Sequence, residues 1–285
     1  MEALMKNLGY YNGEIGLIEE MRVPMLDRAC VFGDGIYDAT YSRNHIIYNL
    51  KEHVDRFFSS AEKLRMTVPM DKKELSKLLS ELVSRVDDGE QFVYFQLTRA
   101  TAPRNHVFPE NTPANLWVML RPAKIKDNDI PVKLITVEDT RFFHCDIKTL
   151  NLIPSVMASQ LAHEAGCDEA VFHRGDIVTE CAHSNVSIIE RGRFVTHPTG
   201  NLILPGIARA NLIKMCKKLN IPVVEEPFTL ERLMNADEII VSSSGSFCLS
   251  ASHIDGKAVG GKAPHILAAL RKELVEDFFT ETEVH

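Results

Sequence analysis

The segment CDIKTLN at residues 145–151 sets a lysine, Lys148, between apolar neighbours just before a predicted helix. About thirty residues later, TECAHSN at 179–185 follows a short predicted strand that ends at Glu180, and NLILPGIAR at 201–209 opens another predicted helix at a glycine. Taken singly these features are ordinary, because a lone lysine or a strand-end glutamate is usually a solvated surface residue. Their order puts an amine, a carboxylate and a helix N-terminus into one candidate site.

These three groups are what a protein needs to hold pyridoxal 5'-phosphate (PLP). A lysine amine forms a Schiff base with it, and a carboxylate beside the pyridine nitrogen keeps that nitrogen protonated, so that the ring accepts electrons. The unpaired N–H groups at a helix start suit the phosphate. Burial lowers the pKa of a lysine, so the apolar neighbours of Lys148 favour a nucleophile and base.

Four further segments fit the same pattern: VFGDGIYD at 31–38, EHVDR at 52–56, RNH at 104–106 and SSSG at 242–245. With the three segments above, they resemble the class IV PLP aminotransferases, and most closely the D-amino acid aminotransferases among them. The resemblance runs from about residue 10 to the penultimate helix. It therefore concerns nearly the whole chain.

The resemblance implies one cofactor site. Lys148 would carry the cofactor and move a proton between it and the α-carbon of the substrate, and Glu180 would pair with the pyridine nitrogen. The implied phosphate contacts are the guanidinium of Arg56, the backbone amides of Ile207 and Ala208, and the hydroxyls of Ser243 and Ser244.

The resemblance also implies a substrate pocket. Tyr37 would point into it, and Arg104 and His106 would reach the active site of the partner subunit to hold the α-carboxylate. Both side chains donate to an anion, although a loop with this sequence could equally be solvated. Branched-chain aminotransferases lack this Arg-x-His pattern, so it favours D-amino acids as substrates.

Two positions depart from the family pattern. Ala208 stands where a threonine hydroxyl usually contacts the phosphate, a loss of about 1 kcal/mol that Arg56 and the serines of the 242–245 turn would offset. His183 replaces one of the small residues that follow the glutamate. We expect His183 to be a packed core histidine; the alternative is that it faces the cofactor.

Composition narrows the class of protein. The 285 residues are 45% hydrophobic and 25% charged, with a formal net charge of -7, which is typical of a globular protein. There is no basic stripe, no apolar run of transmembrane length and no signal-peptide core, so we expect no nucleic-acid partner, no membrane partner and a cytoplasmic location. The six cysteines are scattered, which predicts reduced thiols. The sequence contains no cysteine and histidine cluster with the spacing of zinc ligands, so we expect no metal site.

Periodicity and turn residues predict the elements. We expect helices at 52–65, 71–86, 154–165, 206–219 and 263–278, and strands at 92–97, 116–120, 132–137 and 238–242, with four or more short strands between 169 and 196, an extended segment at 221–224 and a turn at 12–13. Because strands and helices do not alternate strictly, the fold class is α+β. The resemblance refines this to the two-domain fold type IV, with a small N-terminal α/β domain and a larger C-terminal domain that has a β-barrel-like core. The domains are expected at 1–120 and 132–285, joined by a polar linker at 121–131.

The activity implied is transamination of D-amino acids of the D-alanine and D-glutamate type with 2-oxo acids, by a ping-pong mechanism in a homodimer with shared active sites. Small-molecule amino acids and 2-oxo acids would be its substrates. Alternatives within PLP chemistry are a branched-chain L-amino acid aminotransferase and a lyase of the aminodeoxychorismate type. A catalytically silent relative is a further alternative from another class.

Overall fold

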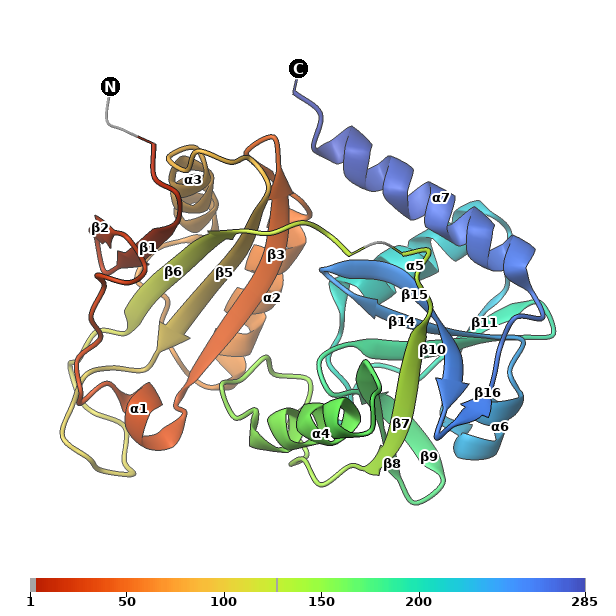
Figure 1. Ribbon diagram of the computed structural model, residues 1–285. Coiled ribbons are helices and arrows are strands. Elements are labelled where there is room, and N and C mark those ends of the chain that lie inside the picture. The colour runs from red at the N-terminus through yellow and green to blue at the C-terminus, as the bar shows by residue number, and fades with distance from the viewer. Residues whose placement is uncertain (1–3, 127, 285) are drawn as a thin grey trace. The chain divides into compact units, whose positions relative to one another are not determined.

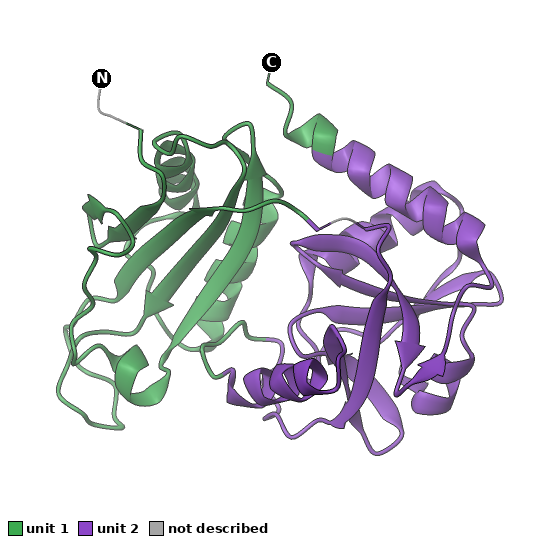
Figure 2. Ribbon diagram, viewed as in Figure 1, with its two compact units in different colours: residues 1–125, 147–151, 279–285 green, residues 126–146, 152–278 purple. Residues whose placement is uncertain are grey.

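The computed structural model describes residues 4–126 and 128–284; Asp127, which falls in the predicted linker, lies outside the described residues. The chain forms two compact units (Figures 1 and 2). The first comprises Met1–Ile125, Ile147–Asn151 and Phe279–His285, and the second comprises Lys126–Asp146 and Leu152–Phe278. The chain passes between units inside the segment predicted as a linker, and the exact domain limits stay a prediction.

The first unit is built on a six-stranded antiparallel sheet in the order β2-β1-β6-β5-β3-β4. The predicted turn at Asn12 and Gly13 joins its first two strands, and both residues have positive φ. The elements of this unit are β1 (Leu8–Tyr11), β2 (Glu14–Gly16), α1 (Arg28–Phe32), β3 (Gly35–Arg43), β4 (Ile46–Ile47), α2 (Leu50–Lys63), α3 (Lys72–Val83), β5 (Gln91–Thr98) and β6 (Asn115–Pro122).

Helices α2 and α3 form the core of this unit with one face of the sheet. Alternation along the strands decides which side chains lie there, so that Ile36 and Phe95 are fully buried while their neighbours point to the opposite face. Phe95 packs on Phe57 of α2, with ring centroids 4.9 Å apart. The predicted capping box is present at the start of α3, where Asp71 and Glu74 bond each other's backbone amides.

The second unit contains a ten-stranded sheet in the order β12-β11-β10-β14-β15-β7-β8-β9-β13, with β16 on β15. Its elements are β7 (Val132–Glu138), α4 (Ile153–Glu164), β8 (Glu169–Arg174), β9 (Ile177–Cys181), β10 (Asn185–Glu190), β11 (Arg193–Thr196), α5 (Ile207–Lys218), β12 (Val223–Glu225), β13 (Phe228–Thr229), α6 (Leu230–Asn235), β14 (Glu238–Ser243), β15 (Ser246–Ile254), β16 (Lys257–Ala258) and α7 (Pro264–Glu281).

This second sheet is strongly curled. Strands β9 and β10 lie far apart in the strand order, yet three residues join them, and the N–H of Cys181 donates to the Ser184 carbonyl in that turn. Such a short connection requires the sheet to bend back on itself, as Figure 1 shows. The predicted α+β class and the barrel-like core are confirmed.

Most predicted elements are present within a few residues of their expected bounds. No bounds were predicted for the short helices α1 and α6, the long strands β3 and β15, or the short strands β4, β13 and β16. All six cysteines are free. Among the described residues, no helix is long and apolar enough to cross a membrane.

Candidate active site

The segment around Lys148 belongs to the first unit because it pairs with the start of β3. The Tyr37 N–H donates to the Lys148 carbonyl at 2.9 Å, and the Leu150 N–H donates to the Gly35 carbonyl at 3.1 Å. Glycine is needed at position 35, because a Cβ there would lie 2.5 Å from the Leu97 carbonyl oxygen. This backbone pairing fixes the position of the lysine against β3.

The side chain of Lys148 is half-buried and lies against an aromatic ring. Its Nζ is 4.3 Å from the ring centroid of Tyr37, a cation–π contact. Among the described residues, no carboxylate pairs with this amine. The structure thus brings together Lys148 and Tyr37, two of the predicted site residues, in one unit.

Arg56 extends from α2 to a buried carboxylate on β3. Its Nε and Nη2 donate to Asp38 Oδ2 and Oδ1 at 2.8 and 2.7 Å, and His53 Nδ1 lies 2.8 Å from Asp38 Oδ1. Burial opposes the charge on Asp38, but Arg56 and His53 outweigh it and lower the pKa of this carboxyl. Burial, together with the charges of Arg56 and Lys148, lowers the pKa of His53 although Asp38 acts to raise it.

The guanidinium of Arg56 is therefore held in one orientation by a charged, buried acceptor. Its predicted contact with a phosphate stays a prediction.

Arg104 and His106 lie in an exposed loop of the same unit. The Phe32 ring at the end of α1 contacts both, with 5.1 Å from its centroid to the guanidinium carbon and 5.1 Å to the imidazole centroid. Arg28 Nη1 donates to the Asn105 carbonyl and so ties the loop to α1. The two predicted carboxylate ligands are thus close to each other, and no contact between them and Tyr37 is present among the described residues.

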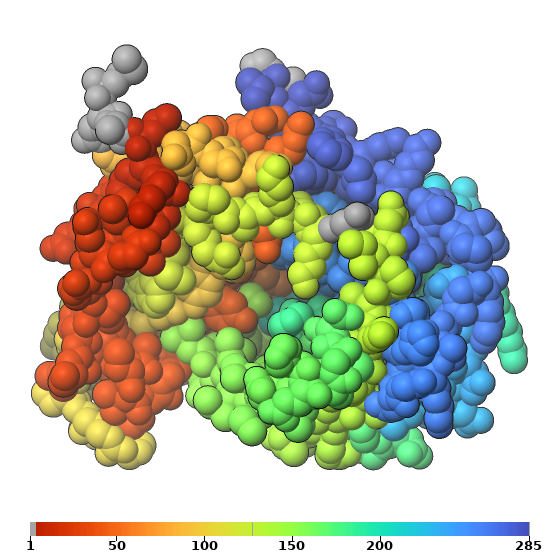
Figure 3. All heavy atoms as spheres, in the orientation of Figure 1, coloured from red at the N-terminus to blue at the C-terminus, as the bar shows by residue number. Residues whose placement is uncertain are grey.

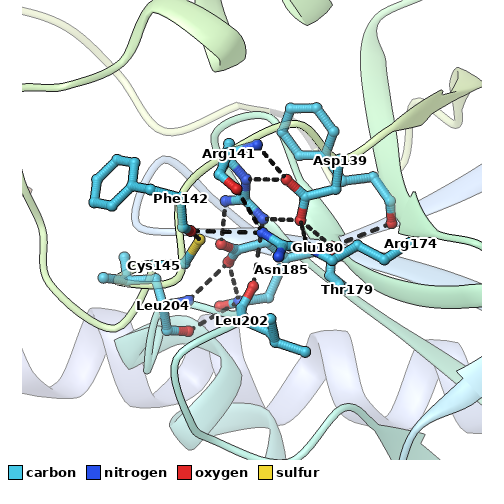
Figure 4. A network of polar contacts seen from close by, with 11 residues as sticks. Asp139, Arg141, Phe142, Cys145, Arg174, Thr179, Glu180, Asn185, Leu202 and Leu204 are labelled. Carbon is cyan, nitrogen blue, oxygen red and sulfur yellow. Dashed lines mark hydrogen bonds and ion pairs between the residues drawn. The ribbon is translucent and has the colours of Figure 1, made fainter.

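Glu180 is the penultimate residue of β9 in the second unit and is almost fully buried. Its Oε1 accepts from Arg141 Nη1 at 2.6 Å, and its Oε2 accepts from Asn185 Nδ2 at 2.9 Å and from the Leu204 N–H at 3.0 Å (Figure 4). Because donors come from three separate segments, the carboxylate cannot rotate without breaking one of these bonds.

A second carboxylate holds the arginine. Asp139 accepts from Arg141 Nε and Nη2, both at 3.0 Å, from Arg174 Nε at 3.1 Å and from the Thr179 hydroxyl at 3.0 Å (Figure 4). Burial opposes both charges, but the hydrogen bonds and opposite charges outweigh it, so the pKa of Asp139 is lowered and that of Arg141 is raised. Glu180 therefore faces a permanent cation.

Helix α5 begins at Gly206, and no side chain caps it. A Cβ on Gly206 would collide with Asn185 Oδ1, so glycine is required at this position. The first helical residues, Ile207 and Ala208, are buried, and their N–H groups point out of the helix start, where an anion binds well. Asn185 contacts both Gly206 and Glu180, which links the helix start to the carboxylate within this unit.

The two serines predicted to contact a phosphate lie at the end of β14 and in the turn that follows it. The hydroxyls of Ser243 and Ser246 lie 2.8 Å apart, and Ser244 occupies the turn itself. They belong to the same unit as α5, and their contact with a ligand stays a prediction.

His183 corrects the sequence interpretation. Its side chain is 62% exposed, and its Nδ1 pairs with Glu169 Oε2, which also accepts from the Ser184 hydroxyl at 2.9 Å. The expectation of a packed core histidine was wrong, because residues 182–184 form the tight turn between β9 and β10 and that turn leaves this side chain outside the core.

Sequence reasoning missed the residues that hold the site residues in place. Asp38, His53, Asp139, Arg141 and Asn185 were not assigned roles. Asn185 and Asp38 carried a usable signal, since each lies in a strand yet is polar and fully or nearly buried. Arg141 follows β7 in an irregular segment, where no periodicity indicates its partners.

Known proteins similar to this chain show the family to which it belongs. A family model described as Amino-transferase class IV matches residues 35–254. The chain is 40% identical over 265 residues to the D-alanine aminotransferase of Listeria monocytogenes serotype 4b (strain F2365), which covers 91% of this chain and 92% of that one. It is 37% identical over 286 residues to the D-alanine aminotransferase of Staphylococcus aureus (strain MSSA476), and this match covers 97% of this chain and 98% of that one.

Among solved structures, the branched-chain amino acid aminotransferase of Escherichia coli matches with a TM-score of 0.88 and 19% identity, covering 97% of this chain and 96% of that chain. At this identity the likeness concerns the fold alone. This chain and the Escherichia coli protein therefore share a fold although their sequences are only 19% identical.

Proposed function

Because the chain belongs to the class IV aminotransferases, we propose that it transfers the amino group of a D-amino acid, of the D-alanine or D-glutamate type, to a 2-oxo acid in a ping-pong cycle. The observation that carries the choice of substrate is the 40% identity to a D-alanine aminotransferase over 91% of this chain. Pyruvate and 2-oxoglutarate are the proposed acceptors. The exposed Arg104–His106 loop supports this choice.

The residues present fit PLP as the cofactor. Lys148 offers a half-buried amine without a carboxylate partner among the described residues, Glu180 is a carboxylate fixed by a cation, and α5 begins with an uncapped turn at an obligatory glycine. When bound, PLP supplies an electron sink for the α-carbon of the substrate. Lys148 would attach it and Glu180 would face its ring nitrogen, while Arg56, Ile207, Ala208, Ser243 and Ser244 would hold its phosphate.

The proposed mechanism assigns each residue a physical task. Lys148 would take the proton from the substrate α-carbon and deliver it to the cofactor. Tyr37, together with Arg104 and His106 of the partner subunit, would hold the α-carboxylate, which orients the α C–H bond toward the amine. Arg141 fixes Glu180 in place through the hydrogen bond from its Nη1 to Glu180 Oε1.

A homodimer with shared active sites is the proposed assembly. Helix α4 carries exposed apolar side chains that one chain leaves unpaired, since Ile153, Val156 and Met157 are 72%, 57% and 59% exposed. Figure 3 shows α4, in green, on the molecular surface. A contiguous apolar patch of this kind marks a protein interface, and a second copy of this chain is the proposed occupant. The proposed location is the cytoplasm.

The visible absorbance of the purified protein tests the function. A band that decays with D-alanine and persists with L-leucine is the expected result. Decay with L-leucine alone would replace the proposal with a branched-chain aminotransferase. A band that neither amino acid changes would favour a lyase or a silent relative, and a colourless protein after addition of PLP would overturn the cofactor assignment.

A further inference from the structure

The first unit's sheet has a second face, opposite the face that packs on α2 and α3. Gln96 of β5 lies on it, directly between Tyr37 of β3 and Trp117 of β6 in the strand register. Directly opposed side chains in antiparallel strands have Cβ atoms about 4.5–5.5 Å apart. The three side chains therefore form one row, and the Tyr37 end of this row contacts the Lys148 amine.

A fourth side chain, Tyr94, fixes the orientation of the glutamine. Its ring stacks on Tyr37 with centroids 5.3 Å apart and lies 5.7 Å from the Trp117 ring. The Tyr94 hydroxyl donates to Gln96 Oε1 at 2.6 Å. Burial raises the pKa of Tyr94, so this hydroxyl keeps its proton. The bond uses the carbonyl end of the amide and leaves its NH2 end to point elsewhere.

Two hydrogen-bond donors of this row lack acceptors. Gln96 is only 5% exposed, yet the described residues give its Nε2 no hydrogen-bond partner. The Trp117 Nε1–H is buried and likewise has no acceptor within the described part of the chain. A buried donor without an acceptor, such as the Trp117 Nε1–H, is costly, and the Gln96 amide beside it offers a second N–H donor that has no protein acceptor among the described residues.

The charge of this face selects the kind of acceptor. On the described strands β3, β5 and β6, the side chains of this face include no carboxylate, because Asp38 alternates to the opposite face with His53 and Arg56. The Lys148 amine contacts the Tyr37 end of the row. The buried Asp27 carboxylate near the row already accepts from Thr98 and Asn115. An anion with two or more acceptor oxygens is therefore compatible with the row, whereas a cation is not.

We propose that Gln96 and Trp117 form a carboxylate-binding subsite beside Tyr37, which takes a carboxylate of the substrate amino acid or 2-oxo acid. The subsite rests on the proposed function for its substrate class. The carboxylate is either the α-carboxylate shared by all substrates or the distal carboxylate of a dicarboxylic substrate. In both cases Gln96 and Trp117 donate and the carboxylate oxygens accept, and Tyr94 acts as the positioning residue.

Trp117 is the single tryptophan of the chain, so its fluorescence reports directly on this row. The protein as purified, with its cofactor, is titrated with two unreactive probes, propionate and glutarate, with sodium chloride at matched ionic strength as the blank. We expect a saturable change with at least one probe, and an increase in its Kd of about tenfold or more in Gln96→Leu. Gln96→Glu keeps an acceptor for the Tyr94 hydroxyl, so it covers the case in which the leucine variant does not fold, and its negative charge should abolish binding.

Tyr41→Phe is the matched control, since Tyr41 lies on the same face of β3, four residues from Tyr37; its Kd values should equal those of the unmodified protein. If the Gln96 variant raises the Kd of propionate and of glutarate by the same factor, the subsite binds the α-carboxylate. If it raises the Kd of glutarate alone, the subsite binds the distal carboxylate. Equal Kd values in a folded Gln96 variant and in the unmodified protein would overturn the subsite, as would the lack of a saturable change with either probe. A protein that binds the probes but fails to transaminate would leave the subsite standing and remove the proposed function.

Discussion

Lys148 and Glu180 are held in opposite ways. The amine of Lys148 has a backbone fixed against β3, but its side chain contacts an aromatic ring and, within the described residues, no carboxylate. The carboxylate of Glu180 accepts from three donors, and a second carboxylate, Asp139, fixes the arginine that binds it.

The difference follows from what each group must do. A base that collects and delivers a proton has to change its contacts during the reaction, so strong ion pairs would slow it. A carboxylate that stabilises a positive charge works best when it is already ionised and oriented before the reaction begins. The first unit thus supplies a group free to move, and the second supplies a group that is fixed in advance.

Replacing Lys148 tests the mobile side and should have the largest effect. Lys148→Ala is expected to reduce kcat by about 10⁴-fold or more, because the variant loses both the attachment point and the base. The measurement is the steady-state rate with D-alanine and 2-oxoglutarate, with far-UV circular dichroism as a check on folding. Lys124→Ala, at an exposed pair with Glu90, is the control and should leave the rate unchanged. Retained turnover in the Lys148 variant would refute the assignment.

Replacing Arg141 tests the fixed side, where stability rather than rate should respond first. Arg141→Leu leaves Asp139 and Glu180 buried without their shared cation, which should lower the free energy of unfolding by about 3–5 kcal/mol. Denaturant unfolding measures this change. Arg193→Leu removes a half-exposed pair with Glu190 in the same unit and should cost less than about 1 kcal/mol. If both variants lost a similar free energy of unfolding, the hydrogen bonds and ion pairs around Glu180 would contribute no more to stability than a surface ion pair.

The sequence predicted this contrast only in part. Local sequence signals were sufficient to predict where some helices begin. Asp71 and Glu74 form the capping box of α3, and Gly206 directly precedes α5. The contacts of Asp139 with Arg174 and of Arg141 with Glu180 join residues 35 and 39 positions apart. They depend on the parallel pairing of β7 with β8, which no local pattern specifies.

The prediction for His183 failed for a related reason. Residues on either side of the β9–β10 turn are buried, whereas the side chain of His183 within the turn is exposed. Its exposure is decided by the direction in which the turn projects this side chain, and that direction is a property of the curled sheet. Site residues that form strands or open helices were thus predictable, whereas the residues that hold them were not.

Arg104 lies on the mobile side and extends the comparison to the substrate. Arg104→Ala should raise KM about 10–100-fold for every α-amino acid tested, since a charge-assisted hydrogen bond contributes about 1.5–3 kcal/mol. Steady-state kinetics with D-alanine and D-glutamate measure the change, and Arg22→Ala, which loses bonds to backbone carbonyls in another loop, serves as control. An unchanged KM would remove the main structural reason for choosing D-amino acids.

The smallest expected effect concerns the charge of Asp139 and its dependence on pH. Its pKa is lowered in the folded protein, so the stabilisation from its ionised form is fully present above the unfolded value of about 3.9 and is lost as the pH falls through the folded value. Asp139→Asn should therefore be less stable than the unmodified protein by about 1–2 kcal/mol at pH 7, and the gap should close as the pH falls below about 4. Asp129→Asn, at a carboxylate that is 88% exposed, should show little gap at any pH. If the difference in the free energy of unfolding between Asp139→Asn and the unmodified protein stayed constant with pH, the shape of the Asp139 side chain, and not its charge, would fix Arg141. The Glu180 network would then be held by packing and neutral hydrogen bonds and not by the charge of Asp139.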